Sequence, residues 1–546
     1  MFTLPHRLKE KNPQFAREVK GRLKPRNVLT TVLLSALAQL LLLASYYSQL
    51  PGVESTSAKF PDVYNRFCTI TRESFSYRAC TQDALGNWVV DWQMWWQEIV
   101  GVISWALPLL LLTSAVYLLI NDLGREERRG TLNFVRMSPE RSQNILLGKL
   151  LGVPVLPYLG VALIVPLHLF AAIEGGIPLG YLAVYYGLIL LLCAFWSLLA
   201  ILFAWLGGNQ GWLGVIALWL CYTTFAQVAR HQPYQLKEAE GNLVLNLPNW
   251  WGLSTGKIEI LLVFGLITLG PATLLLWKAA NRRFRRPNAT LLTRTQSYLA
   301  TAFLQIWLLG FVVVSTNNAR YPETMNDSLT LVLVANLGWF LCLMAILLPH
   351  RQTLIDWARY RRQQVGCQRT GRQIPLLSDL VFGENSPASG AIAMNLAIAV
   401  GINALWVSNW PVLSDRPDHR FEALFALVMA ATSLLLCAMV AQLLLMQRSP
   451  KRAVWTATTI GGLLLIPPIC LGVFITTYGI TPLTLLWAFT VASPVLVWQS
   501  SGSLALLGWL SQITACALVT STLTRKLIKA GESESKALLG SVRSDV

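Results

Sequence analysis

Long runs of apolar residues, separated by short polar loops, follow one another along the whole chain. A helix that crosses a bilayer needs about 20 apolar residues, because the hydrocarbon core is about 30 Å thick. Twelve runs are near this length, at 28–49, 99–120, 145–172, 180–206, 212–229, 258–279, 297–315, 328–348, 390–408, 421–446, 453–476 and 502–524. The pattern predicts an all-α polytopic membrane protein with twelve transmembrane helices.

A further apolar run, 480–498, contains Pro482 and Pro494. If this run crossed the bilayer completely, the basic residues after the last span, Arg525 and Lys526 among them, would lie outside, against the rule that basic loops stay inside. We therefore predict a re-entrant segment that enters from the outer face. Non-helical backbone at that depth is tolerated where other helices bury it.

Basic residues gather before the first span, after the sixth span and after the eighth. They are Arg7, Lys9, Lys11, Arg17, Lys20, Arg22, Lys24 and Arg26, then Arg282, Arg283, Arg285 and Arg286, then Arg351, Arg359, Arg361, Arg362, Arg369 and Arg372. The loops on the opposite side carry acids such as Glu54 and Asp62. Because basic loops mark the cytoplasmic side, both termini are predicted to be cytoplasmic.

Composition agrees with this class of protein. Hydrophobic residues make up 54% of the chain and charged residues only 13%, which excludes a soluble globular protein of this size. The 44 Lys and Arg residues outnumber the 27 Asp and Glu residues, but they lie in short loops between apolar runs. The basic excess is therefore attributed to membrane topology, so membrane lipid is an expected partner and nucleic acid is not.

The N-terminal segment 1–27 has a helical pattern of its own. Phe15, Val19 and Leu23 recur at helical spacing within 13–25, and basic residues cover the remaining positions. This pattern predicts an amphipathic interface helix that lies on the cytoplasmic membrane surface. The alternative is a basic flank that only sets the topology of the first span.

The nine cysteines differ in their predicted surroundings. Only Cys68 and Cys80 share the long outer loop, 51–98, where oxidation is possible. A bridge between them would close a small loop and add local order; two free thiols are the alternative. The chain has neither a CxxC nor an HExxH pattern, so no metal site is predicted.

The layout of the chain is repeated. Residues 28–295 and 296–546 each provide six spans, with a cytoplasmic segment after the second span, 121–144 in one half and 349–389 in the other. A Ser-Pro pair stands a few residues ahead of the next span in both halves, at Ser138 and at Ser386. An even number of spans separates equivalent positions, so the halves form a parallel repeat, and the second half ends in a cytoplasmic C-terminal tail.

The first cytoplasmic segment carries a recognisable motif. Glu126-Glu-Arg-Arg-Gly-Thr-Leu, followed by Ser138-Pro and Ile145-Leu-Leu-Gly-Lys-Leu-Leu, resembles the signature of ABC-2 type permeases of ATP-binding cassette transporters. Asn133 stands where the family usually has Glu. The resemblance implies an interface helix at 13–25, a coupling helix at about 124–141 and re-entrant outer helices within 230–257 and 480–498, before spans six and twelve. The second half resembles the family by layout only.

The resemblance also implies which residues contact an ATPase. They are Arg125, Glu126, Glu127, Arg128, Arg129, Gly130, Thr131, Leu132, Ser138 and Pro139 in the first half, and Glu384, Ser386 and Pro387 in the second. A solvated charged loop is the alternative, because most charge runs are solvated and surface ion pairs contribute only about 0–1 kcal/mol.

No loop in the chain is suited to bind nucleotide phosphates. The pattern GxxxxGK[ST] does not occur, and the Gly-Lys pairs at Gly148 and Gly256 are followed by Leu and Ile. We therefore expect no catalytic residue and no cofactor in this chain, with ATP and Mg²⁺ bound by separate cytoplasmic ATPase subunits. The implied function is the permease subunit of an exporter for an unidentified substrate, in the inner (plasma) membrane of a bacterium.

Two other classes of function remain as alternatives. A secondary transporter usually carries ionisable residues inside its spans, and here those spans are nearly free of carboxylates, with Glu259 close to an outer end. A membrane-embedded enzyme needs a nucleophile or a metal cluster near one interface. The outer carboxylates Asp83, Asp91 and Glu98 have no His beside them in the sequence.

Overall fold

The computed structural model describes the chain in segments. These are residues 12–51, 65–68, 73–74, 77–78, 83, 88–205, 210–230, 249–253, 258–287, 289–317, 322–349, 351–366, 376–411, 418–449, 451–478, 490, 493–496 and 502–531. They fall into two compact units: unit 1 is Met1–Leu247 with Thr255–Arg285, and unit 2 is Pro248–Ser254 with Arg286–Val546. The division lies close to the predicted one at 295, but Pro248–Ser254 belongs with unit 2 rather than with the first half.

The described secondary structure of unit 1 is helical apart from one short hairpin and one isolated β-bridge between Cys68 and Val90. Its helices are α2 (Pro13–Arg22), α3 (Pro25–Tyr47), α4 (Trp92–Arg128), α5 (Thr131–Arg136), α6 (Ser142–Gly152), α7 (Val155–Glu174), α8 (Leu179–Trp205), α9 (Gly211–Arg230) and α10 (Ile258–Arg285). Strands β1 (Glu73–Ser74) and β2 (Tyr77–Arg78) pair antiparallel in the predicted outer loop. Helix α4 packs against α7, α8 and α9, so it forms the centre of this unit.

Local sequence explains where several of these helices begin and end. Pro13 and Pro25 occupy first-turn positions of α2 and α3, where proline is favoured because no intrahelical amide bond is lost. The carboxylate of Asp91 caps α4 by accepting a hydrogen bond from the Met94 amide at 3.0 Å. Predicted span 145–172 is divided into α6 and α7, because Pro154 has no amide hydrogen to continue the helical ladder.

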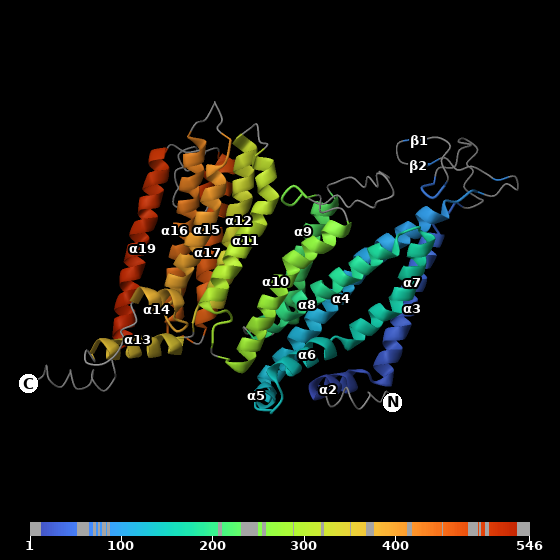
Figure 1. Cartoon of the computed structure of the whole chain (residues 1–546), viewed down its shortest axis with the longest axis horizontal. Helices are drawn as coiled ribbons and strands as arrows, with labels where there is room; N and C mark the ends of the chain where they lie inside the picture. The colour runs from blue at the N-terminus through green and yellow to red at the C-terminus, as the bar shows by residue number, and fades with distance from the viewer. Residues whose placement is uncertain are drawn as a thin grey trace, which may run out of the picture. The chain divides into compact units, whose positions relative to one another are not determined.

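Unit 2 consists of nine described helices. They are α11 (Arg294–Asn317), α12 (Pro322–Leu347), α13 (Arg351–Gly366), α14 (Leu376–Phe382), α15 (Ala388–Ser408), α16 (His419–Leu445), α17 (Arg452–Tyr478), α18 (Ser493–Leu496) and α19 (Gly502–Ala530). The long helices of this unit run side by side, and α13 and α14 lie across one end of them (Figure 1).

Buried amides join three long helices of unit 2. The side chain of Gln305 on α11 donates a hydrogen bond to Asn336 of α12 at 2.7 Å and accepts one from Asn403 of α15, also at 2.7 Å. All three side chains are buried. Polar side chains that bond across helices in this way hold transmembrane helices together, because hydrocarbon offers them no other partner.

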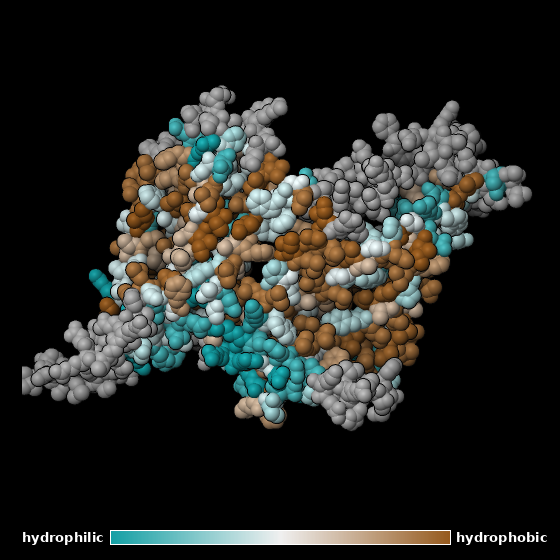
Figure 2. Space-filling view, viewed as in Figure 1, coloured by the Kyte–Doolittle hydropathy of each residue, from teal (hydrophilic) through white to brown (hydrophobic). Residues whose placement is uncertain are grey.

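Eleven helices among the described residues are long and apolar enough to cross a membrane. Each matches one of the twelve predicted spans, and α9 occupies the remaining one with a shorter apolar stretch, Gly211–Thr223. Apolar side chains cover the sides of the long helices (Figure 2). The prediction of an all-α multi-pass membrane protein is therefore confirmed. The predicted re-entrant segments within 230–257 and 480–498 lie largely outside the described residues.

Candidate functional site

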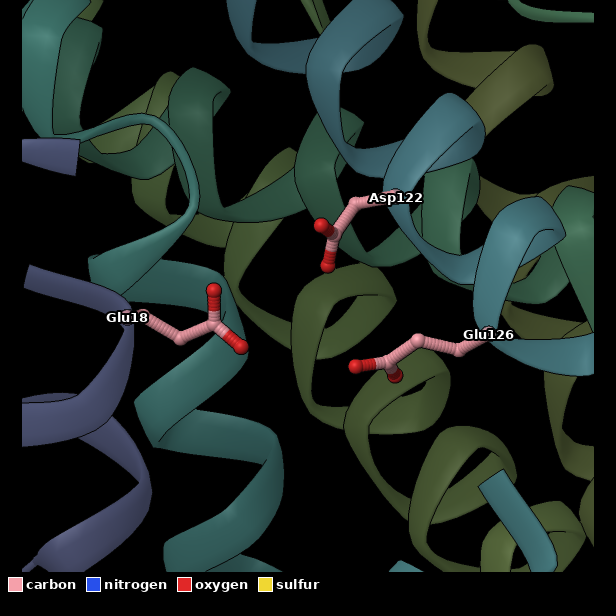
Figure 3. Close-up of side chains that lie close together, drawn as sticks. All are labelled: Glu18, Asp122 and Glu126. Atoms are coloured by element: carbon pink, nitrogen blue, oxygen red, sulfur yellow. The ribbon is translucent and has the colours of Figure 1, made fainter. Parts of the chain in front are cut away.

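A buried lysine forms ion pairs with three carboxylates at one end of unit 1. Lys149 of α6 places its Nζ 2.6 Å from Glu18 of α2, 2.8 Å from Asp122 of α4 and 2.6 Å from Glu126, also of α4. Only 4% of the lysine side chain is exposed. The three carboxylates point toward one another from two separate helices (Figure 3). We call Glu18, Arg22, Asp122, Glu126 and Lys149 the ion cluster.

Arg22 is the second cation of the ion cluster. Its guanidinium donates to Asp122 at 2.6 Å and to Glu18 at 3.4 Å. Helix α6 lies outside the candidate membrane spans. Burial by itself lowers the pKa of Lys149, but the neighbouring carboxylates raise it by more, so the ammonium stays charged. Three acids and two bases leave the ion cluster with one excess negative charge.

The three carboxylates also have a geometry that metals use. Their oxygen atoms lie within 4.8 Å of one another. The Lys149 ammonium, however, is already within hydrogen-bond distance of all three. A lysine ammonium is a compact positive charge with three donors, so it can bond one oxygen of each carboxylate and occupy the position that a metal ion would take. We therefore interpret the ion cluster as a set of ion pairs that holds α2, α4 and α6 together.

Two glycines of α6 bring α2 close enough for these ion pairs. Gly148 and Gly152 flank Lys149 and lie one turn apart, which places them on one helix face. A Cβ atom on Gly148 would lie 2.8 Å from the backbone nitrogen of Phe15, and a Cβ atom on Gly152 would lie 2.6 Å from Cβ of Glu18. Small residues four apart allow helix backbones to approach closely.

We expect Gly152→Val to push α2 away from α6. The new side chain would overlap Glu18, and overpacking of this kind costs about 1–3 kcal/mol. Hydrogen exchange of the α2 amides should become at least about fivefold faster. Gly21→Ala is the matched control, since a Cβ atom there meets nothing within 4 Å. Unchanged exchange in Gly152→Val would contradict the close packing.

The residues predicted to contact an ATPase do not all face outward. Of the seven predicted residues at 125–131, six are exposed: Arg125, Glu127, Arg128, Arg129, Gly130 and Thr131. Pro139 is exposed and Ser138 is half-buried, whereas Leu132 is buried. Glu126 turns inward to Lys149 with only 17% of its side chain exposed. Its carboxylate is thus bonded inside unit 1.

Helix α5 presents two large apolar side chains to its surroundings. Phe134 is 76% exposed and Met137, its C-terminal capping residue, is 77% exposed. On the other side of α5, Leu132 and Val135 are buried. Gly130 starts the helix with a positive φ of 70°, a conformation that residues with a side chain rarely adopt. Phe134 and Met137 were not among the predicted contact residues, because that prediction was based on the charged residues of the motif.

Helix α5 and its flanks are fixed to the end of α10. The Arg136 guanidinium lies 5.7 Å from the centre of the Phe284 ring, which is a cation–π distance. Burial lowers the pKa of Arg136, and the charge of Glu127 opposes this shift. The hydroxyl of Ser142, at the start of α6, donates to Asn281 at 2.6 Å and accepts from Arg285 at 2.8 Å.

In unit 2 the predicted contact residues lie at the corner where the chain turns from α14 into α15. Ser386 and Pro387 are buried and Glu384 is half-buried. Arg294 is also buried, and its guanidinium donates to the carbonyl oxygen of Ser386 at 2.8 Å. The exposed apolar residues lie just before this corner, on α14: Leu376, Leu377 and Phe382.

No protein-family model matches the sequence, and neither a curated protein nor a solved structure is significantly similar to it.

The predicted interface helix and the predicted disulfide fall in different parts of unit 1. Helix α2 occupies most of 13–25, with Val19 buried and with Phe15 and Leu23 half-buried. Cys68 is disulfide-bonded. Cys80 lies outside the described residues, so its pairing with Cys68 stays a prediction.

Two tryptophans of the segment Pro248–Ser254 dock onto α11 in unit 2. Trp250 Nε1 donates to the carbonyl oxygen of Trp307 at 3.0 Å, and the amide of Trp251 donates to that of Gly310 at 2.7 Å. Trp251 has a φ of 50°, which is strained for a bulky residue. Beside it runs a groove of about 630 Å³, lined almost entirely by apolar side chains.

Gly310→Val should displace this tryptophan segment, because a Cβ atom on Gly310 would overlap the indole of Trp250. The hydrogen bond from the Trp251 amide would then be lost, and its hydrogen exchange should accelerate at least about tenfold. Gly338→Val is the control, since a Cβ atom there meets nothing within 4 Å. Equal exchange in both variants would show that Gly310 is not needed for docking.

Proposed function

We propose that this chain is the permease subunit of an ATP-binding cassette transporter, and that α5 is the element on which a separate ATPase docks. The observation that carries the proposal is the pair Phe134 and Met137, exposed on the short helix α5 and at its C-cap, directly after the 37-residue helix α4. Large apolar side chains that protrude beside exposed charges are typical of a protein-binding surface. The resemblance to ABC-2 type permeases covers the same segment.

The exposed charges next to α5 extend this surface. Glu127, Arg128 and Arg129 are exposed, and such rim charges speed association and favour a partner of complementary charge more than they raise affinity. Glu126 is assigned to the ion cluster instead of to the partner. In unit 2 we assign the equivalent role to the exposed residues Leu377 and Phe382 of α14, in place of Glu384, Ser386 and Pro387.

Helix α4 could transmit movement of a docked ATPase directly to the transmembrane spans. Helix α4 runs without interruption from Trp92 to Arg128, so its last turns next to α5 and its membrane-spanning part belong to one helix. The ion cluster fixes the same end of α4 to α2 and α6. A push on α5 would therefore move several helices together, as in the rigid-body transitions that open and close transport paths.

Purification of the tagged full chain from its native membranes tests the proposal. We expect a subunit with a nucleotide-binding motif to co-purify and the complex to hydrolyse ATP. The chain reconstituted without that subunit should hydrolyse none. Accumulation of a substrate by the chain alone, driven by an ion gradient, would replace this proposal with a secondary transporter.

A further inference from the structure

Helix α2 has two faces that differ in charge and in burial. The inner face carries Glu18 and Arg22 of the ion cluster together with the buried Val19, and it packs on α6. The outer face is cationic. The exposed cations on α2 and at the start of α3 are Arg17, Lys20, Lys24 and Arg26. We call these four residues the basic face.

The basic face has no partner within the described part of the chain. Each of its four side chains is exposed and takes part in none of the hydrogen bonds or ion pairs among the described residues. Arg17 and Lys20 are three positions apart on α2, which places them on the same side of that helix, and Lys24 follows its end as the N-cap of α3. Glu18, the acidic residue of 13–26, is half-buried, so no exposed acid within this described segment neutralises them.

The apolar stripe of α2 is not available to anchor this helix in lipid. Val19 is only 5% exposed, and Phe15 and Glu18 lie against the two glycines of α6. An interfacial helix normally inserts its apolar face between lipid tails. Here Val19 is buried and Phe15 and Leu23 are each half-buried, so contact between α2 and the membrane surface depends mostly on the cations.

The position of the basic face indicates the partner. It lies just before and in the first turn of α3, a helix apolar enough to span the membrane that begins at Pro25. Cations beside the start of a span lie at the level of lipid headgroups, where each contributes about 1 kcal/mol of attraction to anionic lipid. We propose that the basic face binds the phosphate headgroups of anionic phospholipids and so holds α2 in its place on α6.

Such lipid binding bears on the end of α4. The same helix that contacts lipid with Lys20 holds Asp122 of α4 with Arg22 and reaches Lys149 with Glu18. Anionic lipid would therefore stabilise the ion cluster from outside. The inference is independent of any ATPase, because lipid binding to the purified chain is measured without a partner subunit.

The test uses the full chain in a neutral detergent, titrated with phosphatidylglycerol or with phosphatidylcholine. Thermal unfolding and the amount of bound lipid are both measured. We expect phosphatidylglycerol alone to stabilise the chain. The variant with Arg17→Gln, Lys20→Gln, Lys24→Gln and Arg26→Gln should bind it at least about tenfold more weakly, and the difference should shrink as salt is added.

Two controls keep the result interpretable. A variant with Lys451, Arg525, Lys526 and Lys529 each changed to Gln removes the same number of exposed cations beside the spans of unit 2. It should lose lipid bound at unit 2 but, in phosphatidylglycerol, should keep the slow hydrogen exchange of the α2 amides that the fourfold α2 variant loses. The charge-preserving pair Arg17→Lys and Arg26→Lys should bind normally, which separates loss of charge from misfolding. Equal stabilisation by phosphatidylcholine, undiminished binding by the fourfold α2 variant, or stabilisation by a polyglutamate peptide but not by lipid would overturn the proposal.

Discussion

Lys149→Met should release α2 from unit 1 and lower the free energy of unfolding by about 3–5 kcal/mol, the usual cost of removing one partner from a buried ion pair. Glu18, Asp122 and Glu126 would remain close together, with Arg22 as the only cation bonded to any of them among the described residues. Like charges at this separation repel strongly where water is scarce. The amides of Pro13–Arg22 should then exchange hydrogen about 100-fold faster or more.

A second substitution tests whether this cost comes from charge. Lys149→Met combined with Glu126→Gln leaves two carboxylates for Arg22 and should recover part of the lost stability. Lys278→Met is the matched control for loss of a lysine, because Lys278 is exposed on α10, outside the ion cluster and the basic face. If Lys149→Met exchanged its α2 amides as slowly as this control does, the ion cluster would not be what holds α2.

Replacing both Phe134 and Met137 with Asp should abolish ATPase association while leaving the permease folded. Both side chains are more than three-quarters exposed, so the change removes little packing within unit 1. Apolar anchors at the centre of an interface contribute about 2 kcal/mol or more each, so the double variant should bind the ATPase at least about 100-fold more weakly. Co-purification and ATP hydrolysis of the complex measure this.

Asn133→Asp is the control for the added charge, since Asn133 is exposed on the same helix and bonds only within α5. This control should associate normally. Thermal unfolding of the double variant should match that of the unchanged chain. Full association by the double variant would show that a partner docks elsewhere, and α14 of unit 2, with Leu377 and Phe382, is then the next surface to change.

Much of the fold follows from the spacing of apolar residues. The runs located all the long helices because a bilayer imposes a minimum apolar length that few other structures share. Their ends were harder to predict, since helices continue beyond the hydrocarbon. Helix α4 extends from Trp92 to Arg128 where the apolar run covers only 99–120. The break between α6 and α7 was missed, although Pro154 was a signal for it.

The segment that forms the candidate site was predicted from the sequence, but the contacts of its side chains were not. The charged motif after the second span was found, yet the bond between its first glutamate and Lys149 within unit 1 was not predicted. A lysine within an apolar run is a signal for a carboxylate partner, and the Gly148 and Gly152 pair around it is a signal for a close helix. The sequence offers many carboxylates, however, and only the folded arrangement selects Glu18, Asp122 and Glu126.

The bonds that α2 makes with residues far along the sequence also set when this helix can pack during synthesis. Lys149 follows Glu18 by 131 residues, and Asp122 follows Arg22 by 100. A ribosome that adds about 5–20 residues per second needs on the order of 10 s to reach that lysine after it has made α2. Helix α2 therefore cannot complete its bonds to unit 1 until residue 149 has been made, and a product that ends before residue 149 never completes them.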